Sequence, residues 1–379
     1  MLIMATSTSS LPKVHQALVL HSTRDPYDIS VVTQDTPQPC PGSAVIRVLS
    51  AGVLTYADRV YSGHKPYPYP EPFVIGSSAI GRVVAVGPDA TSLKPGQLVF
   101  FDSFIQGRDN PNSLILHGLS GGFDTASNKL MEGEWRDGTY AEYAKVPLEN
   151  CFPLDENRLT GKRADGGFGY SIADLAYLWT ISVPFGGLQD IAIRSGEKVI
   201  ISPAAGTFGS AAVLAALAMG AQVIAVGRNR ETLDKVKSLD SERIRTVLNT
   251  GNVENDVKEL TKYGLADAFF DISPGKAVTS THFKSCIMSL RRGGRVSLMG
   301  AHGELKLPTQ FIMLNDITVK GKWMYTKDDM RNMIKLLEAG YLKLDVAQTA
   351  GNFPMEEFAE AFDKAAKISG PLSQVLISP

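Results

Sequence analysis

The stretch from Lys198 to Arg228 reads KVIISPAAGTFGSAAVLAALAMGAQVIAVGR, and it decides the fold. It opens with the β-branched run Val199–Ile201, which is typical of a buried parallel strand. Strong helix formers follow over Ala211–Met219, Gly220 is placed to end that helix, and Gln222–Val226 returns as a second strand. This order of strand, turn, helix and strand predicts one unit of a doubly wound α/β sheet.

The turn between the first strand and the helix is a glycine loop. Its sequence AAGTFG matches the spacing G-x-G-x-x-G, with Ala204 in place of the first glycine. The missing side chain at Gly206 lets the backbone approach a pyrophosphate, and Gly209 lets the helix pack tightly on the strand. We expect Gly206, Thr207 and Phe208 to offer backbone amides to that pyrophosphate at the helix N-terminus. The loop therefore predicts dinucleotide binding.

The residues after the second strand indicate which dinucleotide binds. An acidic residue here accepts the ribose 2′-hydroxyl of NAD, whereas the 2′-phosphate of NADP needs positive charge. The segment VGRNR, 226–230, has no carboxylate and carries Arg228 and Arg230. Because a guanidinium suits phosphate, we expect Arg228 with Asn229 to meet the 2′-phosphate and NADPH to be the cofactor. The alternative is that both arginines are simply solvated loop residues.

Composition limits the class of protein and its partners. The chain has 379 residues, of which 44% are hydrophobic and 20% charged, so it can form two globular domains. A formal net charge of -1 gives no electrostatic reason to expect nucleic acid or an anionic membrane as a partner. We expect a small-molecule substrate instead.

Cysteine usage and the N-terminus bear on the compartment. Cys40, Cys151 and Cys286 are odd in number and far apart, which does not suit a disulfide framework. The first 13 residues have no basic start or apolar run typical of a signal peptide. The longest apolar stretch, 211–227, is interrupted by Gly220 and Gln222 and divides into helix and strand, so no membrane span is expected. A cytoplasmic protein is predicted.

The chain before the glycine loop has a different pattern. From Val14 to about Val146, short β-like runs such as Ala44–Val48, Gly81–Val86 and Gln97–Phe101 alternate with turns rich in glycine and proline. This pattern predicts a β-rich domain. The segment Ser171–Arg194 is expected to be largely helical and to lead into the dinucleotide-binding unit.

Further strands are expected after that unit. Candidates are Ala266–Ile272, Gly294–Met299 and Ile317–Gly321, with helices between them. Ser273 and Gly300 come directly after two of these strands, where α/β sheets bind ligands, so both are predicted to contact the cofactor. The remaining elements expected are two helices and a final strand: Asp328–Ala339, Met355–Ala366 and Gln374–Ile377.

Several motifs together resemble the medium-chain dehydrogenase/reductase superfamily. Beyond AAGTFG, they are AGVLTYADRVYSG (51–63), PFVIGSSAIGRVVAVGPDATSLKPGQLV (72–99), GTYAEYAKVP (138–147) and GGRVSLMG (293–300). The resemblance covers nearly the whole chain and is strongest to fungal alcohol-dehydrogenase-like proteins, many of them associated with specialised metabolism. It implies a GroES-like catalytic domain over 1–170, a Rossmann NADP-binding domain over 171–327, and a segment 328–379 that returns to the catalytic domain. It also implies an active site in the cleft between the domains, and a possible homodimer.

Zinc-dependent members of this superfamily hold their catalytic metal through cysteine and a His-Glu pair. Here Thr55 stands at the first cysteine position, and Ser77 and Ser78 stand where His and Glu would be. Hydroxyls are poor zinc ligands beside thiolate and imidazole. The segment 102–135, which corresponds to the structural-zinc lobe, contains no cysteine. We therefore predict that both zinc sites are absent, as in the branch of quinone and enoyl reductases.

Four residues are candidates for the chemistry that zinc would otherwise perform. Tyr56 follows the vacated cysteine position and could donate to an enolate, or form an aromatic wall. Thr55 and Ser77 could bond cofactor or substrate oxygens, or act as small polar fillers. His64 lies in a proline-rich loop that borders the cleft in the family, as a proton donor or as a solvated side chain. Asp58 is predicted to be structural.

The resulting hypothesis is a zinc-independent, NADPH-dependent reductase of a small conjugated enone, enoyl or quinone-like substrate. One alternative is metal-free reduction of a ketone or oxidation of an alcohol. Another is an NADPH-binding protein with a sensing role or a redox-neutral cyclase or isomerase activity. The segment 102–135 is rich in Gly, Asn and Ser, and could form a substrate lid, a partner surface or an ordered surface excursion.

Overall fold

The computed structural model describes residues 11–24, 26–277, 279–301, 303–368 and 370–379. These residues form two compact units. The first unit runs to Trp179 and resumes at Gln348–Ile368 and Gln374–Pro379, and the second comprises Thr180–Ala347 with 370–373. Residues 1–10, which include most of the expected N-terminal tail, lie outside the described residues.

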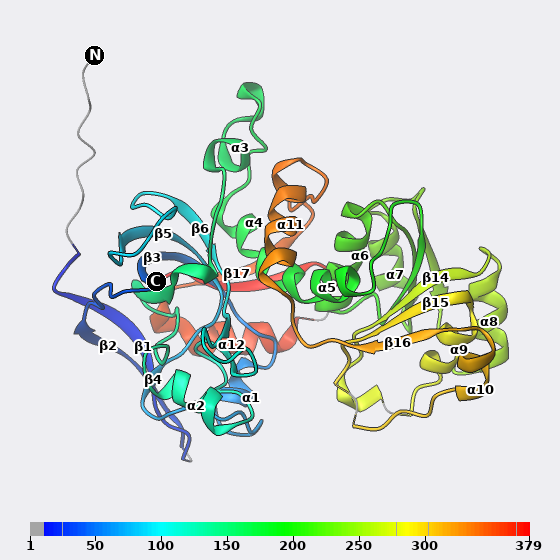
Figure 1. Cartoon of the computed structure of the whole chain (residues 1–379), viewed down its shortest axis with the longest axis horizontal. Coiled ribbons are helices and arrows are strands. Elements are labelled where there is room, and N and C mark those ends of the chain that lie inside the picture. Colours follow the sequence, from blue (N-terminus) through cyan, green and yellow to red (C-terminus); the bar gives the residue numbers. More distant parts are fainter. Residues whose placement is uncertain (1–10, 25, 278, 302, 369) are drawn as a thin grey trace. The chain divides into compact units, whose positions relative to one another are not determined.

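The second unit contains a parallel β-sheet. In the described part of the chain it has six strands in the order β13-β12-β11-β14-β15-β16, so the strand order reverses beside β11. Figure 1 labels β14, β15 and β16 of this sheet. The strands are β11 (Lys198–Ser202), β12 (Gln222–Gly227), β13 (Ile244–Leu248), β14 (Ala266–Asp271), β15 (Leu290–Leu298) and β16 (Thr318–Gly321). The helices are α5 (Leu178–Asp190), α6 (Thr207–Ala218), α7 (Arg230–Lys237), α8 (Val253–Thr261), α9 (His282–Met288), α10 (Thr309–Leu314) and α11 (Lys327–Glu338). The predicted doubly wound fold is confirmed.

Helices cover both faces of this sheet. Leu260 of α8 and Phe283 of α9 join Ile200 and Ile224 of the sheet in one buried cluster, against which Phe311 of α10 packs. The connections through α6 and α7 run in the opposite direction along the sheet, so right-handed crossovers place these two helices on the other face (Figure 1). Both faces are therefore buried, which explains the continuous apolar runs of the strands.

The predicted unit of strand, helix and strand is present at the expected residues. Between α6 and β12, Gly220 has a φ of 84° and ends the helix in the left-handed conformation that favours glycine. Gly209 lies so close to the strand that a Cβ atom there would be 1.8 Å from the carbonyl oxygen of Pro203. The tight packing of α6 on β11 therefore requires glycine at this position.

The first unit is built on antiparallel strands, as its turn-rich sequence predicts. Its strands are β1 (Val14–Ser22), β2 (Asp28–Asp35), β3 (Ser43–Gly52), β4 (Phe73–Val74), β5 (Ala79–Val86), β6 (Leu98–Phe101), β7 (Phe104–Gln106), β8 (Leu114–Leu116), β9 (Tyr143–Pro147), β10 (Cys151–Pro153), β17 (Gln348–Phe353) and β18 (Ser373–Ile377). Its helices are α1 (Ala57–Tyr61), α2 (Thr125–Glu132), α3 (Glu156–Thr160), α4 (Ile172–Ala176) and α12 (Phe358–Lys367). Short 3₁₀ turns occur in both units at η1 (Leu148–Asn150), η2 (Arg163–Asp165), η3 (Gly275–Ala277) and η4 (Met355–Glu357).

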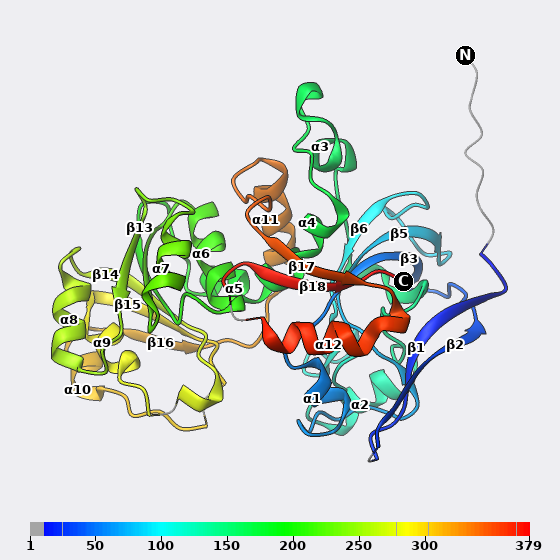
Figure 2. The same ribbon diagram turned by 180° about the vertical axis from the view of Figure 1, so that it is seen from behind.

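The C-terminal segment returns to the first unit. Strand β18 pairs with β3 on one side and β17 on the other, within the main sheet of this unit. Helix α12 lies beside α1 (Figure 2). The rings of Phe362 in α12 and Tyr61 in α1 stack with their centroids 5.8 Å apart. The observed return begins at Gln348, whereas the expected boundary is 328. The difference arises because α11 belongs to the second unit. Just before α11, Tyr325 packs against Gly186 of α5, where an added Cβ atom on the glycine would lie 2.5 Å from the Tyr325 Cβ.

The segment 102–135 is an ordered excursion. It contains the hairpin β7–β8 and helix α2, and its core residues Ile105, Ile115 and Met131 are buried. Asp124 caps α2 by accepting a hydrogen bond from the backbone N–H of Ser127 at 2.8 Å. The segment is therefore folded, and its role as a substrate lid, a partner surface or a plain surface excursion stays a prediction.

The cysteines and the longest helices bear on disulfide formation and on membrane insertion. Cys40, Cys151 and Cys286 form no disulfide bonds with one another. No helix in the described ranges is both long and apolar enough to span a bilayer.

Candidate active site

The glycine loop of the second unit is shaped to receive an anion. Gly206 stands at the N-cap of α6 and supplies no side-chain cap, and the first N–H groups of a helix have no partner within it. A Cβ atom built on Gly206 meets nothing within 4 Å, so open space borders the backbone at this residue. Thr207 and Phe208 form the first turn of α6, and Ala204 is buried, with its N–H donating to Val226 at 2.8 Å. This geometry fits a pyrophosphate, as the sequence predicts.

Two arginines follow the tip of β12. Arg228 and Arg230 are exposed, and neither guanidinium forms an ion pair or hydrogen bond with another described residue. Asn229 has a structural role instead, because its side-chain oxygen caps α7 by accepting from the N–H of Thr232 at 3.1 Å. Because its side-chain oxygen is engaged, Asn229 could donate to a 2′-phosphate only through its side-chain NH₂ group. Arg228 remains a free cation at the predicted position.

Ser273 and Gly300 lie where the sequence places them, beyond the carboxyl ends of β14 and β15. The backbone N–H of Ala301 donates to the Ser273 carbonyl at 3.1 Å, so the two segments run side by side. The Ser273 hydroxyl is bonded to the buried side chains of Asp271 and His282 at 2.6 and 2.9 Å. The Ser273 side chain is therefore engaged by the protein, and its backbone borders the crevice at the reversal of strand order.

In the first unit, Thr55, Tyr56 and Ser77 gather at one end of a strand pair. Strands β3 and β5 are antiparallel with Ala51 opposite Ala79, so Thr55 follows and Ser77 precedes the same end of the ladder. The hydroxyls of Thr55 and Ser77 make no hydrogen bond with any other described residue. Both are therefore available to a ligand.

Ser78 differs from its neighbour Ser77. Its hydroxyl donates to Ser103 Oγ at 2.9 Å and accepts from the Ser103 N–H at 3.1 Å, both within a buried environment.

Among the described residues, no three His, Cys, Asp or Glu side chains are grouped so that they could hold a metal ion.

Tyr56 lies under the loop that follows α1. The Lys65 ammonium sits 3.8 Å from the centroid of the Tyr56 ring and 4.8 Å from that of Tyr67. Burial, and then the neighbouring Tyr67 phenol, raise the pKa of Tyr56 well above its ordinary value. Tyr56 is thus a neutral phenol at physiological pH, able to donate a hydrogen bond and reluctant to release the proton.

Two other residues singled out from the sequence have ordinary partners. His64 is exposed, and its Nδ1 lies 2.7 Å from Ser62 Oγ, which is the arrangement of a solvated loop histidine. Asp58 accepts a hydrogen bond from the Tyr27 phenol at 2.9 Å, so it connects α1 to the start of β2. This agrees with the structural role expected of Asp58.

His117 and His282 are two of the buried histidines that no motif in the sequence singles out. His117 is fully buried after β8, its ring meets Phe101 edge-on at 5.2 Å, and neither ring nitrogen has a hydrogen-bond partner. Burial lowers the pKa of His117 to about 4. His282 is 4% exposed at the first residue of α9. No spacing rule points to His117, whose ring nitrogens have no partner, or to His282, whose partners Asp271 and Ser273 lie at the end of the preceding strand.

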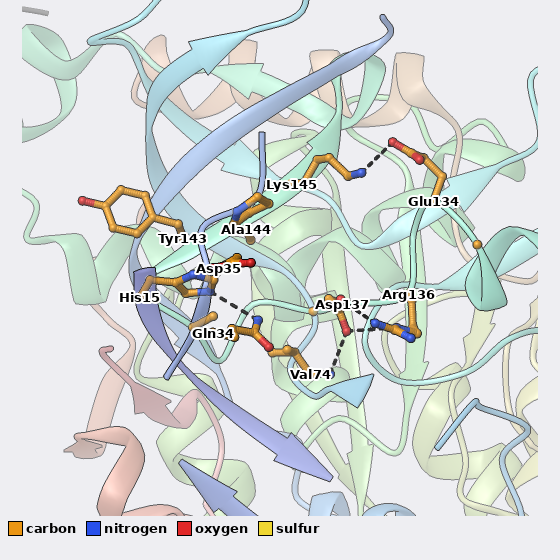
Figure 3. A pocket seen from close by; sticks show the side chains of 14 residues that line it. His15, Gln34, Asp35, Val74, Glu134, Arg136, Asp137, Tyr143, Ala144 and Lys145 are labelled. Carbon is orange, nitrogen blue, oxygen red and sulfur yellow. Dashed lines mark hydrogen bonds and ion pairs between the residues drawn. The ribbon is translucent and has the colours of Figure 1, made fainter. Parts of the chain in front are cut away.

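The first unit also contains a polar pocket of about 440 Å³ (Figure 3). His15, Gln34, Asp137 and Lys145 are among its lining residues, and none of the predicted catalytic residues lines it. Burial lowers the pKa of His15, and its Nδ1 has no hydrogen-bond partner. The pocket is therefore separate from the end of the β3–β5 ladder that carries Thr55 and Ser77.

Comparisons with known proteins match both parts of the chain. Residues 40–156 match the alcohol dehydrogenase GroES-like domain, and residues 208–339 match the zinc-binding dehydrogenase family. An alcohol dehydrogenase of Moraxella sp. (strain TAE123) is 26% identical over 358 residues, which cover 94% of this chain and 97% of that protein. L-galactonate-5-dehydrogenase of Escherichia coli (strain K12) is 24% identical over 346 residues, covering 90% and 93%.

A solved structure shows the same fold. It is the short chain alcohol dehydrogenase of E. coli CFT073 complexed with NADH, with a TM-score of 0.76, 18% identity, and coverage of 97% of this chain and 100% of that one. The two domain models occur in the expected order, and the sequence relatives span nearly the whole chain. The chain belongs to the medium-chain dehydrogenase/reductase superfamily of oxidoreductases.

Proposed function

We propose that this protein is a zinc-independent, NADPH-dependent reductase that acts on a conjugated carbon–carbon double bond of a small enone, enoyl or quinone-like molecule. The observation that carries the proposal is the set of hydroxyls at Thr55, Ser77 and Ser78, which stand at the metal-ligand positions of zinc-dependent relatives. Hydroxyls do not fit a zinc centre, and the Ser78 hydroxyl is already paired with Ser103. Polarisation of a substrate carbonyl must then come from hydrogen-bond donors.

The residues of the first unit supply such donors. The neutral Tyr56 phenol would donate to the oxygen that becomes negative when the conjugated system accepts a hydride, and the free hydroxyls of Thr55 and Ser77 could do the same. Because its pKa is raised, Tyr56 suits hydrogen bonding to an enolate oxygen better than full proton transfer. NADPH, when bound, supplies the hydride.

The residues of the second unit fit the cofactor. Gly206 leaves open space beside the N-terminus of α6 for the pyrophosphate, and the unpaired Arg228 guanidinium would bind the 2′-phosphate. Ser273 and Gly300 would contact the cofactor through their backbones at the crevice. The choice of NADPH over NADH depends on Arg228.

Replacing this arginine tests the cofactor assignment. We expect Arg228→Asp to lower kcat/KM with NADPH at least about tenfold relative to NADH, because the charge-assisted hydrogen bonds to the 2′-phosphate are lost. Initial rates with both cofactors give the ratio. Lys237→Asp, which makes the same charge change at the exposed end of α7, should leave the ratio unchanged. A wild-type ratio in Arg228→Asp would contradict NADPH selection.

Product analysis tests the reaction. Supplied with NADPH and an α,β-unsaturated ketone, the enzyme should yield the saturated ketone and leave that ketone unreduced when it is offered alone. Tyr56→Phe should slow this reaction about 100-fold at saturating substrate, since one donor to the developing oxyanion is removed. Tyr341→Phe, which makes the same change at an exposed tyrosine of the second unit, serves as the control and should leave the rate unchanged. An allylic alcohol as the product would overturn reduction of the double bond.

A second candidate function is metal-free reduction of a ketone or oxidation of an alcohol. The names of the relatives favour it, because both the Moraxella and the E. coli proteins are dehydrogenases. The same substrate pair separates the two reactions, since a carbonyl reductase converts the saturated ketone to its alcohol. NADPH binding without consumption across a panel of carbonyl substrates would favour the third possibility, a sensing or redox-neutral role.

A further inference from the structure

A buried polar network lies at the carboxyl end of β14. Asp271 is fully buried, and the Ser273 hydroxyl donates to its Oδ1 at 2.6 Å. The His282 Nε2 lies 2.9 Å from Ser273 Oγ and 3.4 Å from Asp271 Oδ1, and the His282 Nδ1 lies 2.6 Å from Ser280 Oγ. Because the Ser273 proton points to Asp271, the Ser273 oxygen accepts from the imidazole Nε2–H. His282 therefore connects the start of α9 to the end of β14.

This network lies beside the crevice of the sheet. Asp271 pairs with Ser202, the last residue of β11, and the N–H of Ile272 donates to the Ser202 carbonyl at 3.2 Å. On the other side, the N–H of Met299 donates to the Asp271 carbonyl at 2.9 Å. The backbone from Asp271 to Ser273 is thus held between β11, which leads into the glycine loop, and the end of β15.

Strand order reverses between β11 and β14, and doubly wound sheets bind their ligands outside the carboxyl ends of the strands at that reversal. The backbone that His282 holds is therefore part of the surface that a dinucleotide would contact. The His282 side chain is only 4% exposed, and both of its ring nitrogens are hydrogen-bonded. Such a side chain restricts the backbone to which it is bonded more strongly than a solvated side chain would.

We infer that His282 is a positioning residue for the dinucleotide. It holds Ser273, and through Ser273 the backbone at the end of β14, in the conformation that receives the cofactor. The residue touches no reacting atom in this role. The inference rests on the proposed function, since it assumes that a nicotinamide dinucleotide binds at this crevice.

Fluorescence titration of the full chain with NADPH and with NADH tests the inference. We expect His282→Leu to raise the Kd of the preferred cofactor about tenfold, because both imidazole hydrogen bonds are lost. His282→Gln should restore the Kd to within about twofold of wild type, since its amide N–H can reach Ser273 as the imidazole Nε2 does. Ser273→Ala, which removes the bridge between His282 and Asp271, should weaken binding to the same extent as His282→Leu.

Ser289→Ala is the matched control. It removes a buried hydrogen bond of 2.8 Å at the other end of α9, from Ser289 Oγ to the Ser285 carbonyl, away from the end of β14. It should leave the Kd unchanged even if thermal unfolding shows a lower Tm. If His282→Leu does not fold, Ser273→Ala carries the test.

Two failures can be told apart. A wild-type chain that binds neither NADPH nor NADH overturns the proposed function together with this inference. Wild-type affinity in His282→Leu or Ser273→Ala, or equal weakening in Ser289→Ala, overturns the inference alone. Failure of His282→Gln to recover binding would also overturn it.

Discussion

Gly209→Ala is expected to destabilise the dinucleotide-binding unit by at least about 3 kcal/mol, and to lower its Tm by roughly 6–12 °C. The added Cβ would lie 1.8 Å from the Pro203 carbonyl oxygen and 3.1 Å from the Ala204 Cα. All three atoms belong to the backbone or are fixed to it, so the clash can be relieved only by moving α6 away from β11. Thermal unfolding followed by circular dichroism measures the effect.

Gly206→Ala is the matched control, since it adds the same methyl group three residues earlier. A Cβ at this position meets nothing within 4 Å, so we expect a Tm within about 2 °C of wild type in the absence of cofactor. That open space is where the pyrophosphate is proposed to lie, so NADPH binding should weaken at least about tenfold. Equal Tm losses in the two variants would contradict this assignment of roles to the two glycines.

The second large effect is the loss of stability in mild acid that is caused by His117. Burial lowers the pKa of this imidazole from 6.5 to about 4, so the unfolded chain takes up the proton at a higher pH than the folded chain does. The stability associated with neutral His117 is therefore complete above pH 6.5 and is lost as the pH falls towards 4. Between pH 7 and pH 5 the loss is about 2 kcal/mol.

Denaturant unfolding at several pH values checks this prediction. His117→Leu should lose about 2 kcal/mol less than wild type over the interval from pH 7 to pH 5, because the titrating group is gone. Leu116→Ala, which changes the adjacent residue and keeps the imidazole, should retain the wild-type pH dependence. If His117→Leu loses as much stability as wild type, His117 is not the source of the acid sensitivity.

The parts of the fold that the sequence predicts are those whose signals are local. The strand β11, the glycine loop and α6 are specified within a few dozen residues by β-branched residues, by Gly209 and by the helix stop at Gly220. By contrast, the hairpin β7–β8 and α2 depend on contacts with distant residues. Gly118, for example, lies so close to Gly76 that an added Cβ would be 1.8 Å from its carbonyl oxygen, and its own carbonyl accepts from the Tyr61 phenol.

The candidate site residues divide in the same way, into those with a local sequence signal and those that depend on contacts made only in the folded chain. Ala204 to Gly209 and Arg228 could be placed because each has a recognisable spacing from a strand or helix. Asn229 is predicted to meet the 2′-phosphate, and the order Asn-Arg-Glu-Thr at the start of an amphipathic helix is also an N-cap signal. His282 could not have been found, since its partners Asp271 and Ser273 become neighbours only when α9 packs beneath β14.

The return of the chain to its first unit bears on how the protein is made. Strand β18, at residues 373–377, pairs with Ala51 and Gly52 at the end of β3, some 320 residues earlier in the chain, whereas β9 pairs with the first half of β3. On a ribosome, the edge of β3 that β18 covers stays open until translation is almost complete, whereas 180–347 can fold as they emerge. The nascent chain thus carries an unpaired strand edge for most of its synthesis, and such edges are sites of aggregation. A chain ending at 347 would expose that edge permanently.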